Sequence, residues 1–461
     1  MKNDNPPTAD TQAVIDRIAA IGSPKIKYAF ADIDGVLRGK IISQQKFLDG
    51  LTDGYGFCDV VWGWDCADVP YDNGAVTGWQ SGYPDASVRL DLGTLRQLPW
   101  EDDLPFFLAD FSGAGNGSDL PACPRSLLKR VAAQARAMGY HAEYAQEFEW
   151  FNFRETPHSL QQKGFRQLEP LTPGMFGYSI LRPSLEQAFN RDLFDWLTRF
   201  DIPLEGLHTE TGPGVYEAAI LHDEVLRAAD KAVLFKTAVK EIAYRHGIVA
   251  TFMAKWNADL PGCSGHIHQS IWTPDRSRNL FFDAGQPDRM SPLMRQFIAG
   301  QLYCLPHITP LFAPTINSYK RLVEGAWAPT TVTWSIDNRT TALRVLNRNE
   351  AYTRVEHRVS GADTNPYLAI AAALASGLYG IRHGLTLDAA ASVGNGYADT
   401  RNGTLPGSLA EATRKMAQSP VANELFGAEF VDYYTRTRDW EARQYARQVS
   451  DWELKRYFEI I

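Results

Sequence analysis

The chain has 461 residues, of which 44% are hydrophobic, 22% charged and 12% aromatic. This is the composition of a folded protein with sizeable cores, and it excludes an intrinsically disordered chain. The net charge of −8 argues against nucleic acid or an anionic membrane as a principal partner, because both bind basic surfaces.

Neither a targeting segment nor a membrane span is predicted. The N-terminal stretch MKNDNPPTADTQAVIDRIAAIG lacks the apolar core of a signal peptide, and no run of about 18 apolar residues occurs. The five cysteines are scattered and include no CxxC pair: Cys58, Cys66, Cys123, Cys263 and Cys304. We therefore expect a cytoplasmic protein with neither a disulfide framework nor a zinc–thiolate site.

The first predicted unit is small and rich in β-structure. After a short amphipathic helix, residues 25–43 alternate apolar and polar positions around an Asp-Gly pair, which predicts a β-hairpin. Strand-like segments continue to LPFFLADF (104–111), and SGAGNGSDLP (112–121) has the composition of a linker. The pattern predicts an N-terminal domain at 25–112 and a catalytic domain at 120–461.

The second predicted unit mixes helices with short strands, so the fold class is α+β. PRSLLKRVAAQARAMG (124–139) has a helical pattern, and helices dominate towards the C-terminus. One is predicted to begin at Asn365-Pro366 and to continue to residue 381. Another is predicted to begin at Ser408, where Glu411 would complete a capping box.

Four segments place ionisable residues at a spacing of two or around a tight turn. They are YAQEFEWFNF (144–153) with Glu147 and Glu149, GHIHQS (265–270) with His266 and His268, TRVEHRVS (353–360) with Arg354, Glu356 and Arg358, and HTETGPGVYEAAI (208–220) with Glu210 and Glu217. Taken singly, such glutamate pairs are usually the solvated face of a sheet, a lone histidine is usually a core residue, and an Arg-Glu-Arg run is usually cross-strand ion pairing.

Several such segments in one chain favour a different interpretation. If these faces converged, five glutamates and a histidine would repel one another unless cations neutralised them. Oxygen ligands with one imidazole and no thiolate favour Mg²⁺ or Mn²⁺ over zinc. Arginines would then face phosphates or carboxylates: Arg321, Arg339, Arg344, Arg354 and Arg358. Neither a P-loop nor GxGxxG is present, so this combination predicts phosphoryl transfer from ATP by another architecture.

Six segments, in this order, resemble the signature segments of the glutamine synthetase family. They are EFEWF, ETGPGVYE, TFMAKW…CSGHIHQSIW, NSYKRLVEG, NRTTALRV and RVEHRVSGADTNPYLAIAAALASGLYG. FADIDGVLRGK and DLGTLRQLPW resemble the family's small N-terminal β-grasp domain, so the resemblance covers about residues 25–455. It implies a curved antiparallel sheet lining a funnel-shaped active site, two or three Mg²⁺ or Mn²⁺ ions, ATP as co-substrate, and a homo-oligomer, commonly a dodecamer, with sites shared between subunits.

The resemblance also implies roles for individual residues. Glu149, Glu210 and Glu217 look like ligands of the metal nearest the amine acceptor, and Glu147, His266 and Glu356 like ligands of the metal that holds the nucleotide phosphates. The residues that match positions near ATP and its phosphates are His268, Ser270, Arg339, Arg344 and Arg354. The residues that match glutamate-binding positions are Glu149, Gly262, Arg321 and Arg358. The residues with an implied catalytic role are Arg339, Arg321 and Asp65.

The family's chemistry has two steps. The γ-carboxylate of glutamate attacks the γ-phosphate of ATP to give γ-glutamyl phosphate, and an amine nitrogen then displaces phosphate. Metals and arginines neutralise charge in the first step, and exclusion of water protects the acyl phosphate in the second.

Two positions depart from the ammonia-using members of this family. Their flap after the SYKRL arginine carries a glutamate that helps bind ammonium, and this chain has Trp327 there. An indole supplies an apolar wall, whereas ammonium needs carboxylates. The alternative is that Trp327 packs the flap while Glu324 supplies the acid. Pro261-Gly262-Cys263 also replaces an Asn-Gly-Ser-Gly-like stretch that touches glutamate.

The loop GFCDVVWGWDCADVPYDN (56–73) matches a family loop that reaches into the neighbouring subunit's site and offers an aspartate. Asp65 is the candidate, with Asp59 and Asp68 as rivals. Candidates for the walls of an amine pocket are Phe57, Trp62 and Trp64 together with Trp327, and core packing is the alternative for the first three.

These departures resemble the γ-glutamyl–amine ligase branch, which includes γ-glutamylpolyamine, γ-glutamylalkylamide and γ-glutamylanilide synthetase-like proteins. The predicted function is ATP-dependent ligation of the γ-carboxylate of L-glutamate to an apolar alkyl- or arylamine, in amine catabolism. The alternatives are a polyamine or ethanolamine ligase, a glutamine synthetase that uses ammonium, and a non-catalytic regulatory or structural member of the family.

Overall fold

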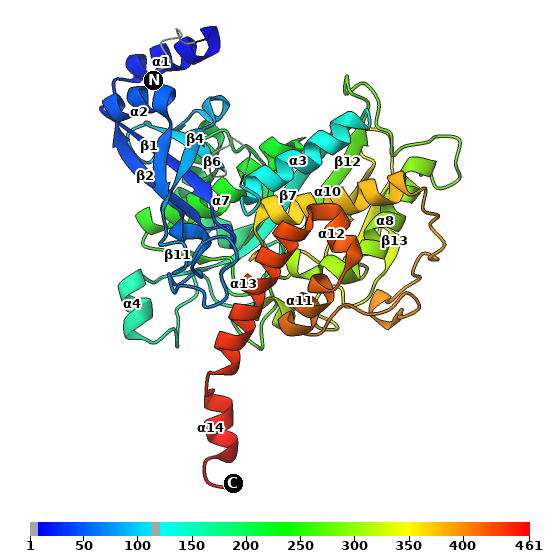
Figure 1. The fold of residues 1–461 in the computed structure, drawn as a ribbon. Helices are drawn as coiled ribbons and strands as arrows, with labels where there is room; N and C mark the ends of the chain where they lie inside the picture. Colours follow the sequence, from blue (N-terminus) through cyan, green and yellow to red (C-terminus); the bar gives the residue numbers. More distant parts are fainter. Residues whose placement is uncertain (1–7, 113–119) are drawn as a thin grey trace.

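The computed structural model describes residues 8–112 and 120–461, which form an α+β protein built on two β-sheets (Figure 1). Most of the predicted linker, 112–121, lies outside the described residues, which omit 113–119. The division at 112 and 120 into two domains therefore stays a prediction.

The first sheet belongs to the N-terminal part of the chain and has the strand order β2-β1-β6-β4-β3, with β5 paired to β6. Its strands are β1 (Lys25–Ala31), β2 (Leu37–Ser43), β3 (Tyr55–Cys58), β4 (Asp85–Leu90), β5 (Arg96–Leu98) and β6 (Leu104–Ser112). The predicted hairpin is confirmed, because β1 and β2 pair antiparallel from Lys25 opposite Ser43 to Ala31 opposite Leu37. Helices α1 (Ala9–Ile21) and α2 (Gln44–Asp53) accompany this sheet.

The second sheet has the order β13-β14-β15-β12-β7-β9-β8, with β10 and β11 also paired to β7. Its strands are β7 (His141–Phe153), β8 (Leu204–Thr209), β9 (Val215–Ile220), β10 (Asp223–Glu224), β11 (Val249–Thr251), β12 (Ile267–Trp272), β13 (Trp334–Ile336), β14 (Leu343–Leu346) and β15 (Arg354–His357). The predicted antiparallel sheet is confirmed except at its edge, where β13 and β14 run parallel.

Four helices pack around one face of this sheet: α3 (Pro124–Ala137), α7 (Val225–Arg245), α8 (Pro292–Ile308) and α10 (Pro366–Arg382). At the crossing of α8 and α10, a Cβ on Gly300 would lie 2.3 Å from the Ser376 carbonyl oxygen, and one on Gly380 would lie 2.0 Å from that of Gln296. Glycine at both positions lets the two backbones touch, which explains why α10 can be almost entirely buried.

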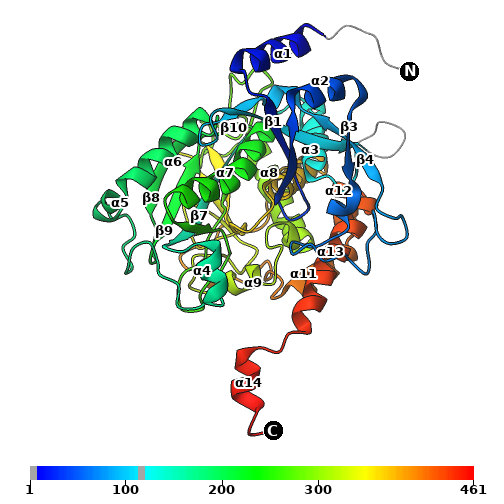
Figure 2. The same cartoon turned by 90° about the vertical axis from the view of Figure 1, so that its left-hand side faces the viewer.

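The remaining helices are α4 (Pro157–Gln162), α5 (Leu181–Leu185), α6 (Gln187–Arg199), α9 (Ser318–Arg321), α11 (Leu409–Ala417), α12 (Pro420–Phe426), α13 (Ala428–Ala446) and α14 (Asp451–Tyr457). Figure 2 shows α14 extending away from the body of the molecule. Across the described ranges, no helix combines the length and apolar character needed to cross a membrane.

Both predicted helix starts are observed, and one differs in detail. The Asn365 side chain accepts a hydrogen bond from the backbone N–H of Tyr367, with Pro366 at the first helical position. Ser408 accepts from the N–H of Glu411, but the Glu411 carboxylate accepts from Gly407 at 2.9 Å. The predicted capping box is therefore wrong in its second bond. The Glu411 carboxylate accepts from the N–H of Gly407 and not from that of Ser408.

Candidate active site

A cavity of about 670 Å³ lies on the face of the second sheet opposite α7. Alternation along β7 creates this two-sided arrangement. Phe148 and Trp150 point towards α7, where each ring lies 5.7 Å from that of Phe235. Glu147 and Glu149 therefore point the other way, and both line the cavity.

The cavity gathers most of the predicted site residues. It is lined by the six predicted metal ligands, Glu147, Glu149, Glu210, Glu217, His266 and Glu356. It is also lined by His268, Gly262, Trp327, Arg339, Arg344, Arg354 and Arg358. Segments far apart in the sequence thus converge on one site, as the spacing-two pattern predicted.

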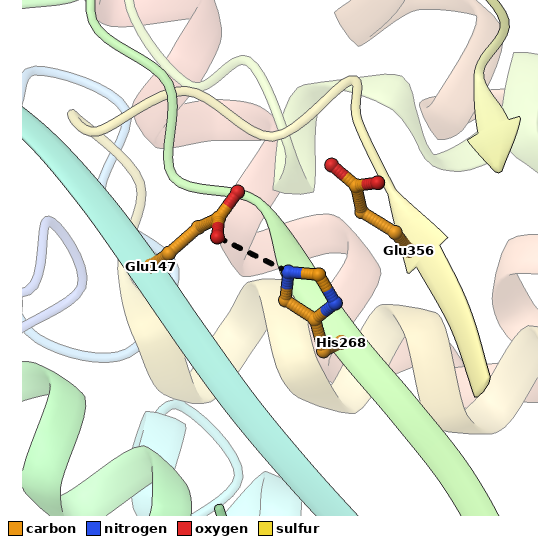
Figure 3. A group of neighbouring side chains, drawn as sticks. All are labelled: Glu147, His268 and Glu356. Carbon is orange, nitrogen blue, oxygen red and sulfur yellow. Dashed lines mark ion pairs between the residues drawn. The ribbon is translucent and has the colours of Figure 1, made fainter. Parts of the chain in front are cut away.

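One group of possible metal ligands consists of Glu147 on β7, His268 on β12 and Glu356 on β15 (Figure 3). His268 Nε2 lies 3.3 Å from Glu147 Oε2. His266, just before β12, joins this group: its Nδ1 lies 2.8 Å from Glu147 Oε1 and 3.3 Å from Glu356 Oε1. Burial and the nearby Arg358 lower the pKa of His266, which keeps its imidazole neutral and able to bind a metal.

Arginines surround the carboxylate of Glu356. Arg344 Nη1 donates to Glu356 Oε2 at 2.8 Å, and Arg358 Nη1 donates to Oε1. Burial alone would raise the pKa of Glu356, but its neighbours, Arg358 first among them, outweigh burial and lower that pKa to about 2. Glu356 is therefore an ionised acceptor held in a fixed position.

A second group consists of His208, Glu210 and Glu217. His208 Nε2 lies 3.3 Å from Glu210 Oε1 and 3.5 Å from Glu217 Oε1. Glu217 is paired opposite Glu149 across β9 and β7. Burial, followed by repulsion from Glu147, Glu149 and Glu210, raises the pKa of Glu217 to about 10.

The two groups fit divalent cations of the magnesium class. Their donors are carboxylate oxygens and imidazole nitrogens, and the buried Cys263 thiol is not among the cavity's lining residues. The Glu217 carboxyl lies beside three other glutamates, and burial followed by their repulsion raises its pKa. Cations bound beside Glu149, Glu210 and Glu217 would remove that repulsion.

Two residues at the site, His208 and Tyr178, were not predicted from the sequence. His208 stands two positions before Glu210, so the spacing-two rule applied to HTETGPGVYEAAI could have found it. Tyr178, which lines the cavity, stacks on the His208 ring with centroids 4.6 Å apart. Tyr178 lies in an irregular segment with φ +57°, where no periodic signal exists to find it.

The predicted arginines differ in their surroundings. Arg339 is exposed and makes no ion pair within the described residues, while Arg354 donates to His268 Nδ1 at 3.1 Å. Arg321 does not line the cavity. It is 2% exposed and donates to the carbonyl oxygens of Val359 and Arg358 and to Ser264 Oγ, and Ser264 does line the cavity.

Gly262 lies on the cavity wall where no side chain would fit. A Cβ at this position would be 2.5 Å from the Ala254 carbonyl oxygen and 2.8 Å from Arg321 Cγ. The Pro-Gly-Cys stretch thus keeps a bare backbone at the wall. Ser270, in contrast, is outside the lining residues, and its hydroxyl accepts from Trp272 Nε1 at 2.9 Å.

Trp327 lines the cavity next to Ala326. Its backbone is left-handed (φ +58°), its side chain is 62% exposed, and its carbonyl oxygen accepts from Arg358 Nη2 at 3.4 Å. Glu324 is exposed and does not line the cavity. The indole, and not this carboxylate, stands at the cavity wall.

The candidates in the loop 56–73 lie away from the cavity of their own chain. Trp62 is fully buried and packs edge-on against Phe111, so its ring is a core residue. Phe57 packs edge-on against Phe30. Trp64 is half-buried beneath the guanidinium of Arg38.

The three candidate aspartates of this loop all have partners within the chain. Asp65 accepts from the N–H groups of Ala67 and Val69 and from Trp440 Nε1 at 2.9 Å. Asp59 accepts from Thr77, and Asp68 pairs with Arg38 at 2.7 Å. Helix α13, which carries Trp440, thereby holds the loop in place.

Comparison with known proteins identifies relatives over almost the whole chain. Residues 121–457 match the family described as glutamine synthetase, catalytic domain. Type-1 glutamine synthetase 2 of Dictyostelium discoideum is 51% identical over 97% of this chain and 86% of its own length. Glutamate–isopropylamine ligase of a Pseudomonas species is 37% identical, over 95% of each chain. Gamma-glutamylethanolamide synthetase GlnA4 of Streptomyces coelicolor is 36% identical, over 99% of this chain and 97% of its own.

The fold also matches solved structures. The GmaS/ADP complex superposes with a TM-score of 0.83 at 27% sequence identity, covering 96% of this chain and 99% of that one. A structure of GmaS without ligand gives a TM-score of 0.82 over the same share of each chain. The matched catalytic domain, the three relatives and the converging acid, histidine and arginine side chains agree: the chain belongs to the glutamine synthetase family.

Proposed function

We propose that this protein is an ATP-dependent ligase that joins the γ-carboxylate of L-glutamate to an organic primary amine with an apolar alkyl or aryl body. The position of Trp327 carries the proposal. An indole at the cavity wall, with Glu324 outside the lining, provides apolar surface where ammonium would need a carboxylate. The relatives named for isopropylamine and ethanolamide support an organic acceptor.

The first step would activate glutamate. Its γ-carboxylate oxygen attacks the γ-phosphorus of ATP, ADP leaves, and γ-glutamyl phosphate forms. Arg339, whose guanidinium is unpaired among the described residues, and Arg354 would hold the phosphates, while Glu356 fixes Arg344 and Arg358 beside them. Mg²⁺ or Mn²⁺ ions held by the two acidic groups would neutralise the carboxylates and the phosphate charge when bound.

The second step would form the amide. The amine nitrogen attacks the acyl carbon, phosphate leaves, and the nitrogen loses a proton. Arg321 and Gly262 would support glutamate, Arg321 through Ser264, so that the acyl carbon stays in place. Trp327 would exclude water from the acyl phosphate and contact the apolar part of the amine.

Glutamine synthesis from ammonium is the second candidate. The 51% identical relative is named a type-1 glutamine synthetase, and Glu210 and Glu217 offer carboxylates at one end of the cavity. Ligation of a polyamine or of ethanolamine is a variant of the first proposal. A non-catalytic role is disfavoured, because a chain without catalysis would have no reason to keep six ionisable ligands facing one another.

Measurement of phosphate release with an acceptor panel tests the proposal. The panel is ammonium, ethylamine, isopropylamine, aniline, ethanolamine and putrescine, each with ATP, glutamate and Mg²⁺ or Mn²⁺. We expect kcat/KM to be at least tenfold higher for an apolar amine than for ammonium. Ammonium as the best acceptor would refute an amine ligase, and no turnover with any acceptor would support a non-catalytic member.

Substitution of the flap residue tests the observation that carries the proposal. Trp327→Glu should lower kcat/KM for apolar amines about tenfold and raise the relative use of ammonium, because a carboxylate replaces the apolar wall. Glu324→Gln is the matched control and should leave the acceptor profile unchanged. If Glu324→Gln instead abolishes ammonium use while Trp327→Glu changes nothing, Trp327 only packs the flap.

Assembly belongs to the same proposal. We propose a cytoplasmic ring oligomer, a dodecamer by family likeness, in which the loop 56–73 of one subunit completes the site of its neighbour. Asp65 and Trp64 would then approach the acceptor from the neighbouring copy. Phe57 and Trp62 would act indirectly, because their rings are buried inside their own chain.

A further inference from the structure

A second cavity, of about 690 Å³, adjoins the catalytic cavity. We call it the vestibule. It is lined by residues from the segment 178–194 and from β8, among them Tyr178, Ile180, Pro183, Phe194, Leu207 and His208. Tyr178 lines both cavities, so the vestibule begins where the acidic end of the catalytic cavity ends. In Figure 2 the elements that build it, α5, α6 and β8, lie together on one side of the molecule.

The stacked rings of Tyr178 and His208 separate the two cavities. Their centroids are 4.6 Å apart and their planes are nearly parallel, at 10°. The Tyr178 N–H donates to the Thr209 carbonyl oxygen at 2.7 Å, and the Ser179 N–H donates to Thr209 Oγ1. These bonds to the end of β8 fix the loop that carries Tyr178. A molecule passing this pair from the vestibule reaches Glu210 and Glu217.

Several apolar side chains that line the vestibule are exposed to solvent. Ile180 is 85% exposed and Phe194 37% exposed, and Leu207 on β8 is half-buried. Isolated exposed apolar residues are ordinary, but several that line one hollow next to a catalytic cavity are typical of a ligand site. The catalytic cavity, in contrast, is lined mainly by charged groups.

Charge restricts what the vestibule can hold. Among the described residues that line it, Arg191 alone is formally charged at pH 7 apart from the titratable His208. None of the described lining residues is a carboxylate, and Asp192, which pairs with Arg191 at 3.1 Å, is not among them. A tail bearing another ammonium group would lose water there and meet the Arg191 guanidinium, whereas an alkyl or aryl tail would bury apolar surface.

We propose that the vestibule binds the apolar body of the acceptor amine, so that the acceptor is a monoamine whose tail extends past Tyr178 while its nitrogen lies near Glu210 and Glu217. This inference rests on the proposed function and narrows it, because it excludes polyamines as preferred acceptors. It also assigns specificity to the segment 178–194, in addition to the flap residue Trp327, which lines the catalytic cavity but not the vestibule.

A series of n-alkylamines tests the vestibule, with methylamine, ethylamine, butylamine and hexylamine as acceptors. We expect kcat/KM to rise about fourfold for each added methylene until the vestibule is filled, which corresponds to the free energy of burying a methylene group. 1,6-Diaminohexane should be at least tenfold poorer than hexylamine, because its second ammonium group finds no partner. A chain-length profile that stays flat would overturn the proposal.

Two neighbouring exposed residues provide a matched pair of variants. Ile180→Asp places a charge in the vestibule, and Leu181→Asp places one on the next residue, which is 72% exposed and does not line the vestibule. We expect the ratio of kcat/KM for hexylamine over methylamine to fall at least tenfold in Ile180→Asp and to stay unchanged in Leu181→Asp. Phe194→Ala, which removes one wall without adding charge, should lower the same ratio about fivefold.

The outcomes separate this inference from the proposed function. Suppose that isopropylamine is preferred to ammonium, but the ratio of kcat/KM for hexylamine over methylamine in all three variants equals that of the unmodified protein. The vestibule proposal is then overturned and the ligase proposal stands. If ammonium is the best acceptor, the ligase proposal itself is refuted. If Ile180→Asp dissociates the oligomer in light-scattering measurements and reduces turnover equally with every amine, the apolar surface is a subunit contact, and the vestibule proposal is overturned as well.

Discussion

Glu356 and Glu217 line the same cavity, yet their surroundings shift their pKa values in opposite directions. Glu356, which is 1% exposed, accepts hydrogen bonds from Arg344 and Arg358, and its pKa is lowered to about 2. Glu217 is partly buried and faces Glu149 and Glu210, and its pKa is raised to about 10. Burial raises the pKa of both groups, so the sign of the net shift is decided by the neighbours.

This difference in pKa divides the cavity into an end rich in guanidinium groups, around Glu356, and an end rich in carboxyl groups, around Glu217. The end with Glu356 contains the guanidinium groups of Arg344 and Arg358, which hold that carboxylate ionised. The end with Glu217 carries uncompensated negative charge, which makes it the place where a metal ion and a protonated amine would be attracted. A site of this kind can bind an anionic donor and a cationic acceptor precursor side by side.

The largest expected effect comes from removing one charge at the acidic end. Glu149→Gln should lower ATP- and glutamate-dependent phosphate release by a factor on the order of 10³ or more, about 4 kcal/mol in barrier, because an amide is a poor ligand for Mg²⁺ or Mn²⁺. Binding of Mn²⁺, followed by electron paramagnetic resonance, should weaken in parallel.

The matched control is Glu205→Gln, which changes an exposed glutamate on β8 outside the cavity. It should leave both turnover and Mn²⁺ binding unaltered. If Glu149→Gln retains activity within about tenfold (~1.4 kcal/mol), Glu149 is not a ligand and the proposed set must be redrawn.

A second pair of variants compares the two ends without metal. Glu356→Gln should destabilise the metal-free protein by about 3 kcal/mol, because it leaves two guanidinium groups without their carboxylate. Glu217→Gln should stabilise it by about 1 kcal/mol or more at pH 8, because the Glu217 carboxyl must take up a proton on folding and an amide need not. Chemical denaturation in the presence of EDTA measures both free energies of unfolding.

The pH dependence of this stability has a defined sign. The folded-state pKa of Glu217, about 10, lies above its ordinary value of 4.5, so folding favours the protonated form. The stability contributed by this group is complete below pH 4.5 and is lost as the pH rises towards 10. The advantage of Glu217→Gln should therefore be larger at pH 8 than at pH 5. Equal differences at both pH values would show that Glu217 titrates normally.

The convergence of charged strands was predictable because it depends on short-range rules. The spacing of two places Glu147 and Glu149 on one face of β7, and the alternating aromatic residues identify the other face as the core. Antiparallel pairing then brings Glu217 opposite Glu149 and His268 opposite Glu356. A pattern of this kind survives folding because the register of a half-buried sheet is strongly specified.

Features that depend on the packing of distant loops were not predictable in this way. The motif that contains Arg321 suggests contact with glutamate, but the guanidinium lies behind Ser264 and bonds to backbone carbonyl groups. Tyr178 lies beside His208 only because an irregular segment returns along β8. Trp62 and Trp64 are two residues apart, yet one is a core residue and the other half-exposed, which composition alone cannot separate.

The smallest effect concerns a single proton and tests the comparison directly. With a folded-state pKa of about 10, Glu217 is protonated in the metal-free protein at pH 7.5, and a metal ion requires its carboxylate form. Binding of Mn²⁺ at pH 7.5 should therefore release close to one proton per site, and the affinity should rise with pH until the pH reaches that pKa. Calorimetric titrations in two buffers with different ionisation enthalpies measure the number of protons. In Glu217→Gln the release should vanish, whereas Glu205→Gln should match the unmodified protein. Release of no proton by the unmodified protein would mean that Glu217 is already ionised, and the two ends of the cavity would then not differ in the way their geometry indicates.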